Sequence, residues 1–267
     1  MRKRATSRLS LSLSLLLPVL SLAGEGLETL TFDAGSMNVI TRETAMPEMG
    51  EGRLDKILTR YYTEGLGGPG KWLEMESIEL TGLLKTASGN YRLTAYQKKP
   101  NLLKLSLTYQ RGELVLGYNG EEAWKQLPGS GREAEPMDEK DARRFIHSSQ
   151  FGSHLLYPYA EGKTISYVDT VPLDGSICHL IRVDLETHHR VDYYIDIRSY
   201  MEVRVESLDL RDQSLVAVEL SEYNRDNLLP IAEKVVNYTN GEWTSELTVE
   251  TIKVNCGVMP WMFDVPK

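Results

Sequence analysis

Hydrophobic residues recur at helical spacing in two parts of the chain. The first stretch predicts an amphipathic helix that ends at GLGGPG (65–70), because Gly and Pro break the pattern. Its apolar positions are Leu54, Ile57, Leu58, Tyr61 and Tyr62. The second helix begins after Asp138, which is an N-cap residue with Asp141 three positions on. We expect its apolar side, interrupted near Gly152, to comprise Ala142, Phe145, Ile146, Leu155 and Leu156.

From about residue 72 the hydrophobic period changes to two, which is typical of half-buried strands. Leu103, Leu105 and Leu107 alternate with polar residues in the first set of strands. The dipeptides Asn119-Gly120 and Asn240-Gly241 predict hairpin turns, so neighbouring strands should pair antiparallel. Later segments with the same period are 163–169, 177–185, 190–197, 201–208, 215–223, 231–238 and 242–254.

This pattern predicts an α+β protein with about ten or more strands and two principal helices. Strands and helices do not alternate along the chain, which argues against a doubly wound parallel sheet. A single antiparallel sheet of this size tends to curl, and its concave face must then be covered. The two amphipathic helices are the available cover. We therefore expect a large curled antiparallel sheet with helices on its concave side.

The N-terminal segment has the layout of a secretory signal peptide. Four basic residues lie within 2–8, an apolar stretch covers 9–22, and Ser21-Leu22-Ala23 supplies small residues at a cleavage site. A membrane anchor is the alternative, but the apolar run is short for a bilayer span. We expect cleavage after residue 23, a lead-in segment at 24–52, one domain at 53–267 and a periplasmic product.

The charge of the chain argues against one class of partner. The 38 acidic and 30 basic residues give a net charge of −8, and removal of the four basic residues of the signal peptide makes this −12. Phosphate binding needs clustered Lys and Arg, so nucleic acid is not expected as a partner.

Motifs for catalysis or metal binding are weak. His147 and His154 lie seven residues apart, on one side of the predicted helix, but no metal-binding motif accompanies them. The pair His188-His189 lies between two predicted strands, and we expect a solvated turn there. Gly65 to Lys71 nearly matches a phosphate-binding loop, but Trp72 stands where the hydroxyl residue is needed. We therefore expect no enzymatic activity, no metal and no cofactor.

The two cysteines leave two alternatives open. Cys178 and Cys256 would form a disulfide in an oxidising compartment, or they are two separate buried thiols.

The sequence also leaves open how the space beneath the curled sheet is occupied. Side chains fill it as a core, or they leave a pocket in which an acyl chain gains about 0.8 kcal/mol per buried methylene.

Four segments of the chain, in their order, resemble the LolA-like superfamily of periplasmic lipoprotein carriers, also called outer-membrane lipoprotein-sorting proteins. The likeness covers about residues 53–266. The segments are Lys98-Lys99-Pro100-Asn101-Leu102-Leu103, the hairpin from Tyr118-Asn119-Gly120 to Trp124, the strand Tyr194-Ile195-Asp196, and Val254-Asn255 with Phe263-Asp264-Val265-Pro266.

The resemblance implies an unclosed β-barrel that holds lipid or lipoprotein acyl chains between its concave sheet and a helical lid. An inner-membrane donor and an outer-membrane acceptor would be its partners. Lys99 stands where the family has the Arg that latches the lid, and Trp124 is expected in the core. Residues expected at the acyl cavity are Leu103, Leu105, Leu107, Phe145, Ile146, Leu155 and Leu156. The alternative is an envelope-stress sensor of the same fold, in which lipid modulates a contact with a partner protein.

Overall fold

The computed structural model describes residues 49–68, 71–109, 112–130, 133–156, 162–226 and 228–266. The predicted signal peptide and the lead-in segment up to residue 48 lie outside these ranges. Among the described residues, no helix has the length and apolar character needed to cross a membrane.

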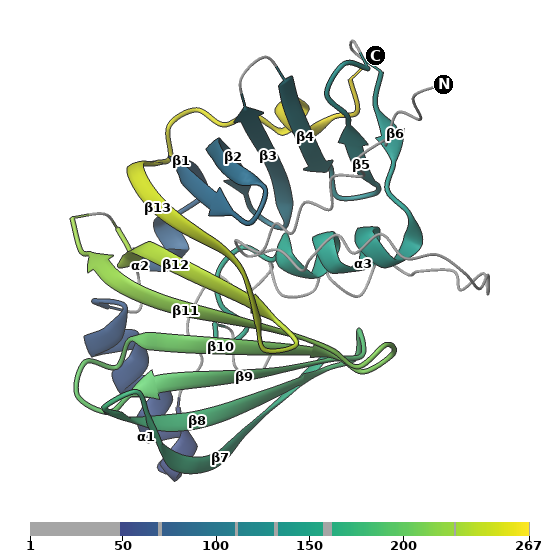
Figure 1. The fold of residues 1–267 in the computed structure, drawn as a ribbon. Helices are drawn as coiled ribbons and strands as arrows, with labels where there is room; N and C mark the ends of the chain where they lie inside the picture. Colours follow the sequence, from purple (N-terminus) through teal and green to yellow (C-terminus); the bar gives the residue numbers. More distant parts are fainter. Residues whose placement is uncertain are drawn as a thin grey trace.

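Within the described ranges, thirteen strands form one antiparallel sheet in the order β6-β5-β4-β3-β2-β1-β13-β12-β11-β10-β9-β8-β7 (Figure 1). Hairpins join most neighbours, and the long-range pairing of β1 with β13 connects the two halves. The end strands β6 and β7 do not pair, so the curled sheet is not closed, as predicted. The strands are β1 (Ser77–Thr86), β2 (Gly89–Lys98), β3 (Leu102–Tyr109), β4 (Gly112–Tyr118), β5 (Ala123–Gln126), β6 (Glu135–Pro136), β7 (Lys163–Leu173), β8 (Ser176–Leu185), β9 (His189–Asp196), β10 (Glu202–Asp209), β11 (Ser214–Asn224), β12 (Ile231–Thr239) and β13 (Glu242–Val254).

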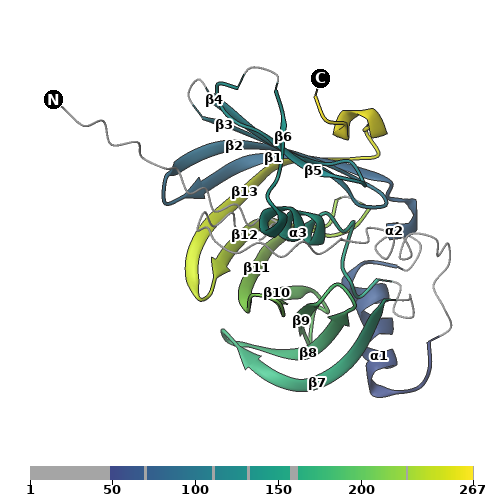
Figure 2. The same cartoon turned by 90° about the vertical axis from the view of Figure 1, so that its right-hand side faces the viewer.

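Two helical segments lie along this sheet. Figure 2 shows the sheet curving around α3 (Glu139–Ser148), with α1 (Arg53–Arg60) beside β7 and β8. The helix α1 continues as a π-helical turn, η2 (Tyr61–Gly65). Two short elements, α2 (Lys71–Glu74) and the 3-10 helix η3 (Pro260–Phe263), complete the described helical segments.

The sheet buries two large hydrophobic clusters, one under each helix. The α3 cluster joins Phe145 and Ile146 of α3 to leucines of β2–β4 and to β12 and β13. The α1 cluster joins α1 and η2 to β8 and β9, together with Leu155 and Leu156. The curled sheet therefore has a separate core in each half.

Local sequence signals account for how the second helix begins and ends. Asp138 is its N-cap, and its side chain accepts a hydrogen bond from the backbone N–H of Asp141 at 3.0 Å, as predicted. The helix ends at Ser148, before the predicted positions Leu155 and Leu156. The hydroxyls of Ser148 and Ser149 donate to carbonyls of the last turn, which competes with continued helix.

The hairpin that carries Trp124 depends on one glycine. Gly117 pairs with Trp124 across β4 and β5, and a Cβ atom at Gly117 would overlap the indole ring. The Trp124 Nε1 donates a hydrogen bond of 3.0 Å to the carbonyl of Phe263, which attaches η3 to the sheet. Trp124 is 1% exposed, so the prediction that it belongs to the core is confirmed.

Candidate functional site

A cavity of about 340 Å³ lies between the end of α3 and strands β9–β13. One wall is apolar, because the period-two pattern of β11, β12 and β13 turns every second side chain toward it. The residues of this apolar wall include Val216, Val218, Leu220, Val235, Leu247 and Val249. The volume lies within the range typical of small-molecule sites.

Of the seven residues predicted to line an acyl cavity, only Leu156 lines this one. Five of the others lie in the α3 cluster, and Leu155 is completely buried in the α1 cluster. The reason is the placement of α3, which packs directly on β2–β4 and fills that half of the curled sheet. The five residues are Leu103, Leu105, Leu107, Phe145 and Ile146.

Two side chains near the end of β2 contact the segment after α3. The Gln97 amide donates to the carbonyls of Ser149 and Gln150 at 3.2 and 2.9 Å, and Gln97 lines the cavity. Lys99, the predicted latch, pairs with Glu76 at 3.3 Å and has its Nζ 5.9 Å from the centroid of the Phe151 ring. The role of Lys99 as a latch stays a prediction.

Three histidines stack at the wall opposite β11–β13. The ring of His147 lies 4.0 Å from that of His189 and 5.4 Å from that of His154, between the ring centroids. Our expectation of a solvated turn at His188-His189 is wrong for the second residue, because His189 begins β9 and is 3% exposed. His154 lies beyond the end of α3, so tertiary folding brings it to His147, not the helical spacing.

Burial holds these histidines in the neutral form. It lowers the pKa of His147 and of His154 well below the usual value, and the neighbouring rings oppose protonation further. The pKa of His189 falls to about 4, mainly through burial and despite the hydrogen bond with the Thr187 carbonyl. The Nε2 atom of His147 is 2.9 Å from the hydroxyl of Ser207 on β10.

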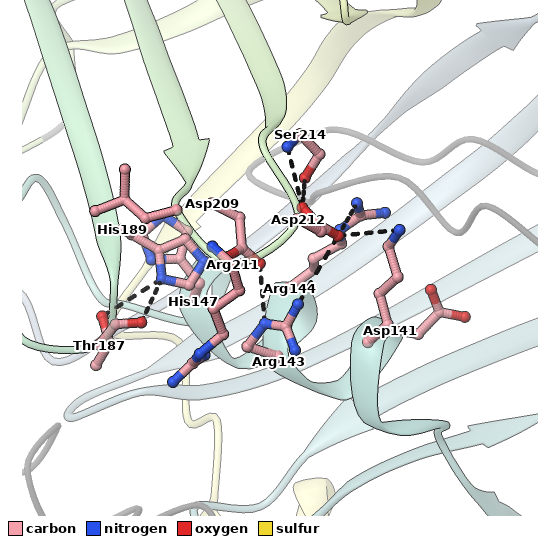
Figure 3. A network of polar contacts seen from close by, with 12 residues as sticks. Asp141, Arg143, Arg144, His147, Thr187, His189, Asp209, Arg211, Asp212 and Ser214 are labelled. Atoms are coloured by element: carbon pink, nitrogen blue, oxygen red, sulfur yellow. Dashed lines mark hydrogen bonds and ion pairs between the residues drawn. The ribbon is translucent and has the colours of Figure 1, made fainter. Parts of the chain in front are cut away.

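Ion pairs connect α3 to the turn between β10 and β11 (Figure 3). Arg143 donates to Asp209 at 2.9 Å and Arg144 to Asp212 at 3.0 Å. Burial would raise the pKa of Asp212, but hydrogen bonds from Ser214 and Lys140 and the charge of Arg144 bring it well below its usual value. These paired charges hold the polar side of α3 against the sheet.

A second polar group surrounds Glu202 at the start of β10. Tyr61 of η2 donates to its carboxylate at 2.6 Å, and Tyr223 donates to its backbone carbonyl at 2.6 Å. Burial raises the pKa of Glu202, while hydrogen bonds from Tyr61 and Ser153 oppose the rise. Tyr193 accepts a hydrogen bond from the backbone N–H of His154 at 3.0 Å, which links this group to the histidine stack.

The two cysteines occupy distant parts of the sheet. Cys178 is buried in β8 and Cys256 is exposed just after β13, and both are free thiols. Five strand spacings of roughly 4.8 Å separate β8 from β13, whereas a disulfide needs Cα atoms within about 7 Å. The structure therefore contradicts the disulfide alternative. It also contradicts two buried thiols, since Cys256 is exposed.

Among the described residues, no group of three or more His, Cys, Asp or Glu side chains is arranged to hold a metal ion. The geometry instead describes an amphipathic cavity. Its apolar wall suits a hydrocarbon group. Its polar lining includes the three histidines, Glu202 and the ion-paired side chains Arg144 and Asp209.

The molecule is thus an unclosed antiparallel barrel with a cavity under its helices. Its fold resembles a LolA superfamily protein from Nitrosomonas europaea, at a TM-score of 0.52 and 9% identity over 88% of this chain and 98% of that one. A DUF1329 family protein from Desulfovibrio piger matches at a TM-score of 0.56 and 10% identity, over 78% of this chain and 95% of that one.

A third structure is a Vibrio parahaemolyticus domain assigned to outer membrane lipoprotein sorting. It matches at a TM-score of 0.50 and 13% identity, over 78% of this chain and 95% of that one. No protein-family model matches the sequence. No curated protein matches it significantly by sequence. At these identities the likeness is one of fold, and the fold is the one that the sequence motifs implied.

Proposed function

We propose that the protein is a lipid-binding carrier that holds an acyl chain of a lipid or lipoprotein in the cavity between α3 and β9–β13. The observation that carries this proposal is the apolar wall formed by β11, β12 and β13. Each methylene group that leaves water for such a wall gains about 0.8 kcal/mol. A carrier needs no catalytic group, and the cavity residues Arg144 and Asp209 are held in ion pairs with Asp212 and Arg143.

The signal peptide predicted from the sequence supports a periplasmic location for this activity. The lipoprotein-sorting assignment of a structural neighbour supports movement of cargo toward the outer membrane. In this proposal an inner-membrane donor loads the cavity and an outer-membrane acceptor empties it.

The segment after α3 is the proposed gate of the cavity. Gln150, Phe151 and His154 all line the cavity, and Gln97 and Lys99 contact this segment from β2. We propose that these contacts hold the segment closed and yield when cargo enters. Gln97 donates hydrogen bonds to two backbone carbonyls of this segment, close to Lys99, the residue that the resemblance implies as the latch.

The first test is lipid binding by the purified protein. Protein prepared without detergent should carry lipid that mass spectrometry detects, and delipidated protein should bind the neutral fluorescent probe N-phenyl-1-naphthylamine. Val218→Trp should lower the affinity for the probe about tenfold or more, because the indole fills part of a cavity of about 340 Å³.

The matched control is Ile177→Trp, which adds the same ring to a side chain that is 51% exposed and does not line the cavity. It should bind the probe as the wild type does. Thermal unfolding of both variants shows that they are folded. Lipid-free wild-type protein that fails to bind the probe contradicts the proposal, and a folded Val218→Trp with unchanged affinity moves the site elsewhere.

A further inference from the structure

The three stacked histidines come from three different elements. His147 belongs to the last turn of α3, His154 to the gate segment (residues 149–156), and His189 to the start of β9. All three line the cavity, and His147 is the middle ring of the stack. The stack therefore joins the gate segment to the helix and to the sheet at the cavity wall.

Positive charges surround the His189 end of the stack. Arg143 and Arg211 both oppose a charge on the His189 ring. The Asp209 carboxylate lies 3.8 Å from the Nε2 atom of His189, but the same oxygen accepts a hydrogen bond of 2.9 Å from Arg143 (Figure 3). A proton on His189 would add a charge beside a carboxylate that already has a cationic partner, which is unfavourable in a buried position.

A cation also lies beside the gate segment. The ammonium group of Lys163 donates to the carbonyls of His154 and Leu156 at 2.7 and 2.6 Å, and its charge opposes protonation of the His154 ring. The ring of His147 lies 5.4 Å from that of His154, and its Nε2 atom is 2.9 Å from the Ser207 hydroxyl. Two protonated rings at this separation would repel each other strongly, because water screens buried charges poorly.

Acid therefore weakens the closed arrangement through these histidines. Burial lowers the pKa of each ring in the closed protein, and opening would return the pKa of the released rings toward the usual 6.5. The open form then binds more protons between pH 6.5 and about 4, so opening is favoured as pH falls through this window.

Side chains that hold the carbonyls of the gate segment do not share this sensitivity. Amide, phenol and ammonium groups ordinarily keep their protonation state between pH 4 and 7.5. The donors of these three kinds are Gln97, Tyr62 and Lys163.

Two acidic groups on the surrounding elements act in the opposite direction. Burial raises the pKa of Glu202, which is hydrogen-bonded to Ser153 of the gate segment, and raises that of Asp141 in α3 to about 7. Acid favours the closed form through such groups. The pKa values of Asp138 and Asp212 are lowered, so these carboxylates stay ionised at pH 5. Because all four groups are unchanged in a histidine variant, such a variant isolates the effect of the stack.

We propose that the histidine stack is an acid-sensitive latch, whose protonation separates the gate segment from α3 and β9 and opens the cavity. Release of a bound acyl chain at acid pH follows, and this part rests on the proposed lipid-binding function. Opening of the gate itself can be measured without any ligand.

Hydrogen–deuterium exchange of the wild-type protein at pH 7.5 and 5.0 tests the opening. After correction for the intrinsic pH dependence of exchange, protection of amides 149–156 should fall about tenfold or more at pH 5.0. One released histidine with a pKa of 6.5 favours the open form by roughly thirtyfold over this range, and the acidic groups offset part of this. Amides of β2 and β3 should keep their protection. Unchanged protection of the segment, or an equal loss in β2 and β3, overturns the inference.

A pair of histidine variants tests the role of the stack. His154→Phe keeps a ring but cannot take a proton, so its loss of protection at pH 5.0 should be at least threefold smaller than that of the wild type. His179→Phe is the matched control, because burial also lowers the pKa of His179, which lies in β8 and does not line the cavity. It should show the wild-type loss. An equal loss in folded His154→Phe and wild type overturns the inference, and His189→Phe decides if His154→Phe does not fold.

Probe binding connects the latch to the proposed function. The affinity of the wild type for N-phenyl-1-naphthylamine should fall about tenfold or more from pH 7.5 to 5.0, and at least threefold less in His154→Phe. Equal affinity of the wild type at both pH values overturns the release of ligand by acid. If the probe does not bind even at pH 7.5, the proposed function fails, and the exchange experiment still decides whether the stack is a latch.

Discussion

At the scale of residues, the buried histidine stack ties the stability of this protein to pH. Burial is the main cause of the low pKa of His189, and the charges of Arg143 and Arg211 act in the same direction. The unfolded chain therefore binds more protons than the folded one between the folded pKa of about 4 and the usual value of 6.5. Stability contributed by neutral His189 is present above this window and is lost as pH falls through it.

The titration of Asp141 changes the stability of the folded protein with pH in the opposite direction to that of His189. Burial and the neighbouring Asp138 raise its pKa from 3.8 to about 7. The folded protein therefore binds the proton more tightly, and the stability from this group is lost as pH rises through 7. Both groups change the free energy of unfolding between pH 4 and 6.5. A variant that lacks one of them is therefore needed to measure the effect of each.

We predict that His189→Phe makes the free energy of unfolding less sensitive to acid. The ring is retained for stacking, but the titration of His189, worth about 3 kcal/mol between pH 6.5 and 4, is removed. Urea unfolding at several pH values measures this difference, and Asp141 is the same in both proteins. His188→Asn, at an exposed neighbour with a φ of 60°, should keep the wild-type slope. A His189→Phe protein with that same slope would contradict the low pKa.

At the scale of elements, the segment after α3 is held by side chains distant in sequence. Gln97 on β2 is 8% exposed and donates to the carbonyls of Ser149, the C-cap of α3, and of Gln150, the residue after it. Strand β2 thus supplies the bonds that complete the end of a helix. This contact links the hydrogen bonding of the helix end to closure of the cavity, which the same segment lines.

We predict that Gln97→Glu loosens this segment. A carboxylate cannot donate to the carbonyls of Ser149 and Gln150, so their amides and those up to Leu156 should exchange with deuterium about tenfold faster. Gln213→Glu is the control, because Gln213 is exposed and its amide donates to the Leu210 carbonyl, outside this segment. Unchanged exchange over 149–156 in Gln97→Glu would show that other contacts keep the segment in place.

Elements with regular spacing were predicted closely. The segments 190–197, 215–223 and 242–254 correspond to β9 (His189–Asp196), β11 and β13, because alternation of apolar and polar residues is a local property of the chain. The Asn240-Gly241 turn was predicted as well, and both residues adopt positive φ angles of 50° and 85°. The second helix was predicted too long, because the apolar positions 155 and 156 continue the helical spacing across a turn.

At the scale of the whole molecule, the open sheet keeps its two halves apart. The α3 cluster and the α1 cluster have different strands and different helices, and the cavity lies between them. The same separation keeps Cys178 and Cys256 far apart. An open sheet with two separate cores leaves space for a ligand between them.

Thiol labelling tests this arrangement. We predict that iodoacetamide adds one group to the native protein, at exposed Cys256, and two groups in denaturant. Burial raises the pKa of Cys178 to about 11, which suppresses its reactivity further. Intact-mass spectrometry counts the groups, and a protein that takes none even in denaturant without a reductant would contain the disulfide.

The sequence by itself determined the strands, most of their turns, the N-cap at Asp138 and the assignment of residues to the concave face. These features depend on local patterns, in which neighbours along the chain decide which way a side chain points. Only the tertiary structure decided which concave-face residues pack and which line a cavity. Leu105 and Val218 have the same alternation in sequence, but Leu105 is buried in the α3 cluster, whereas Val218 lies at its edge and lines the cavity. The meeting of His147, His154 and His189 also depends on where α3 ends against the sheet, which no spacing along the chain encodes.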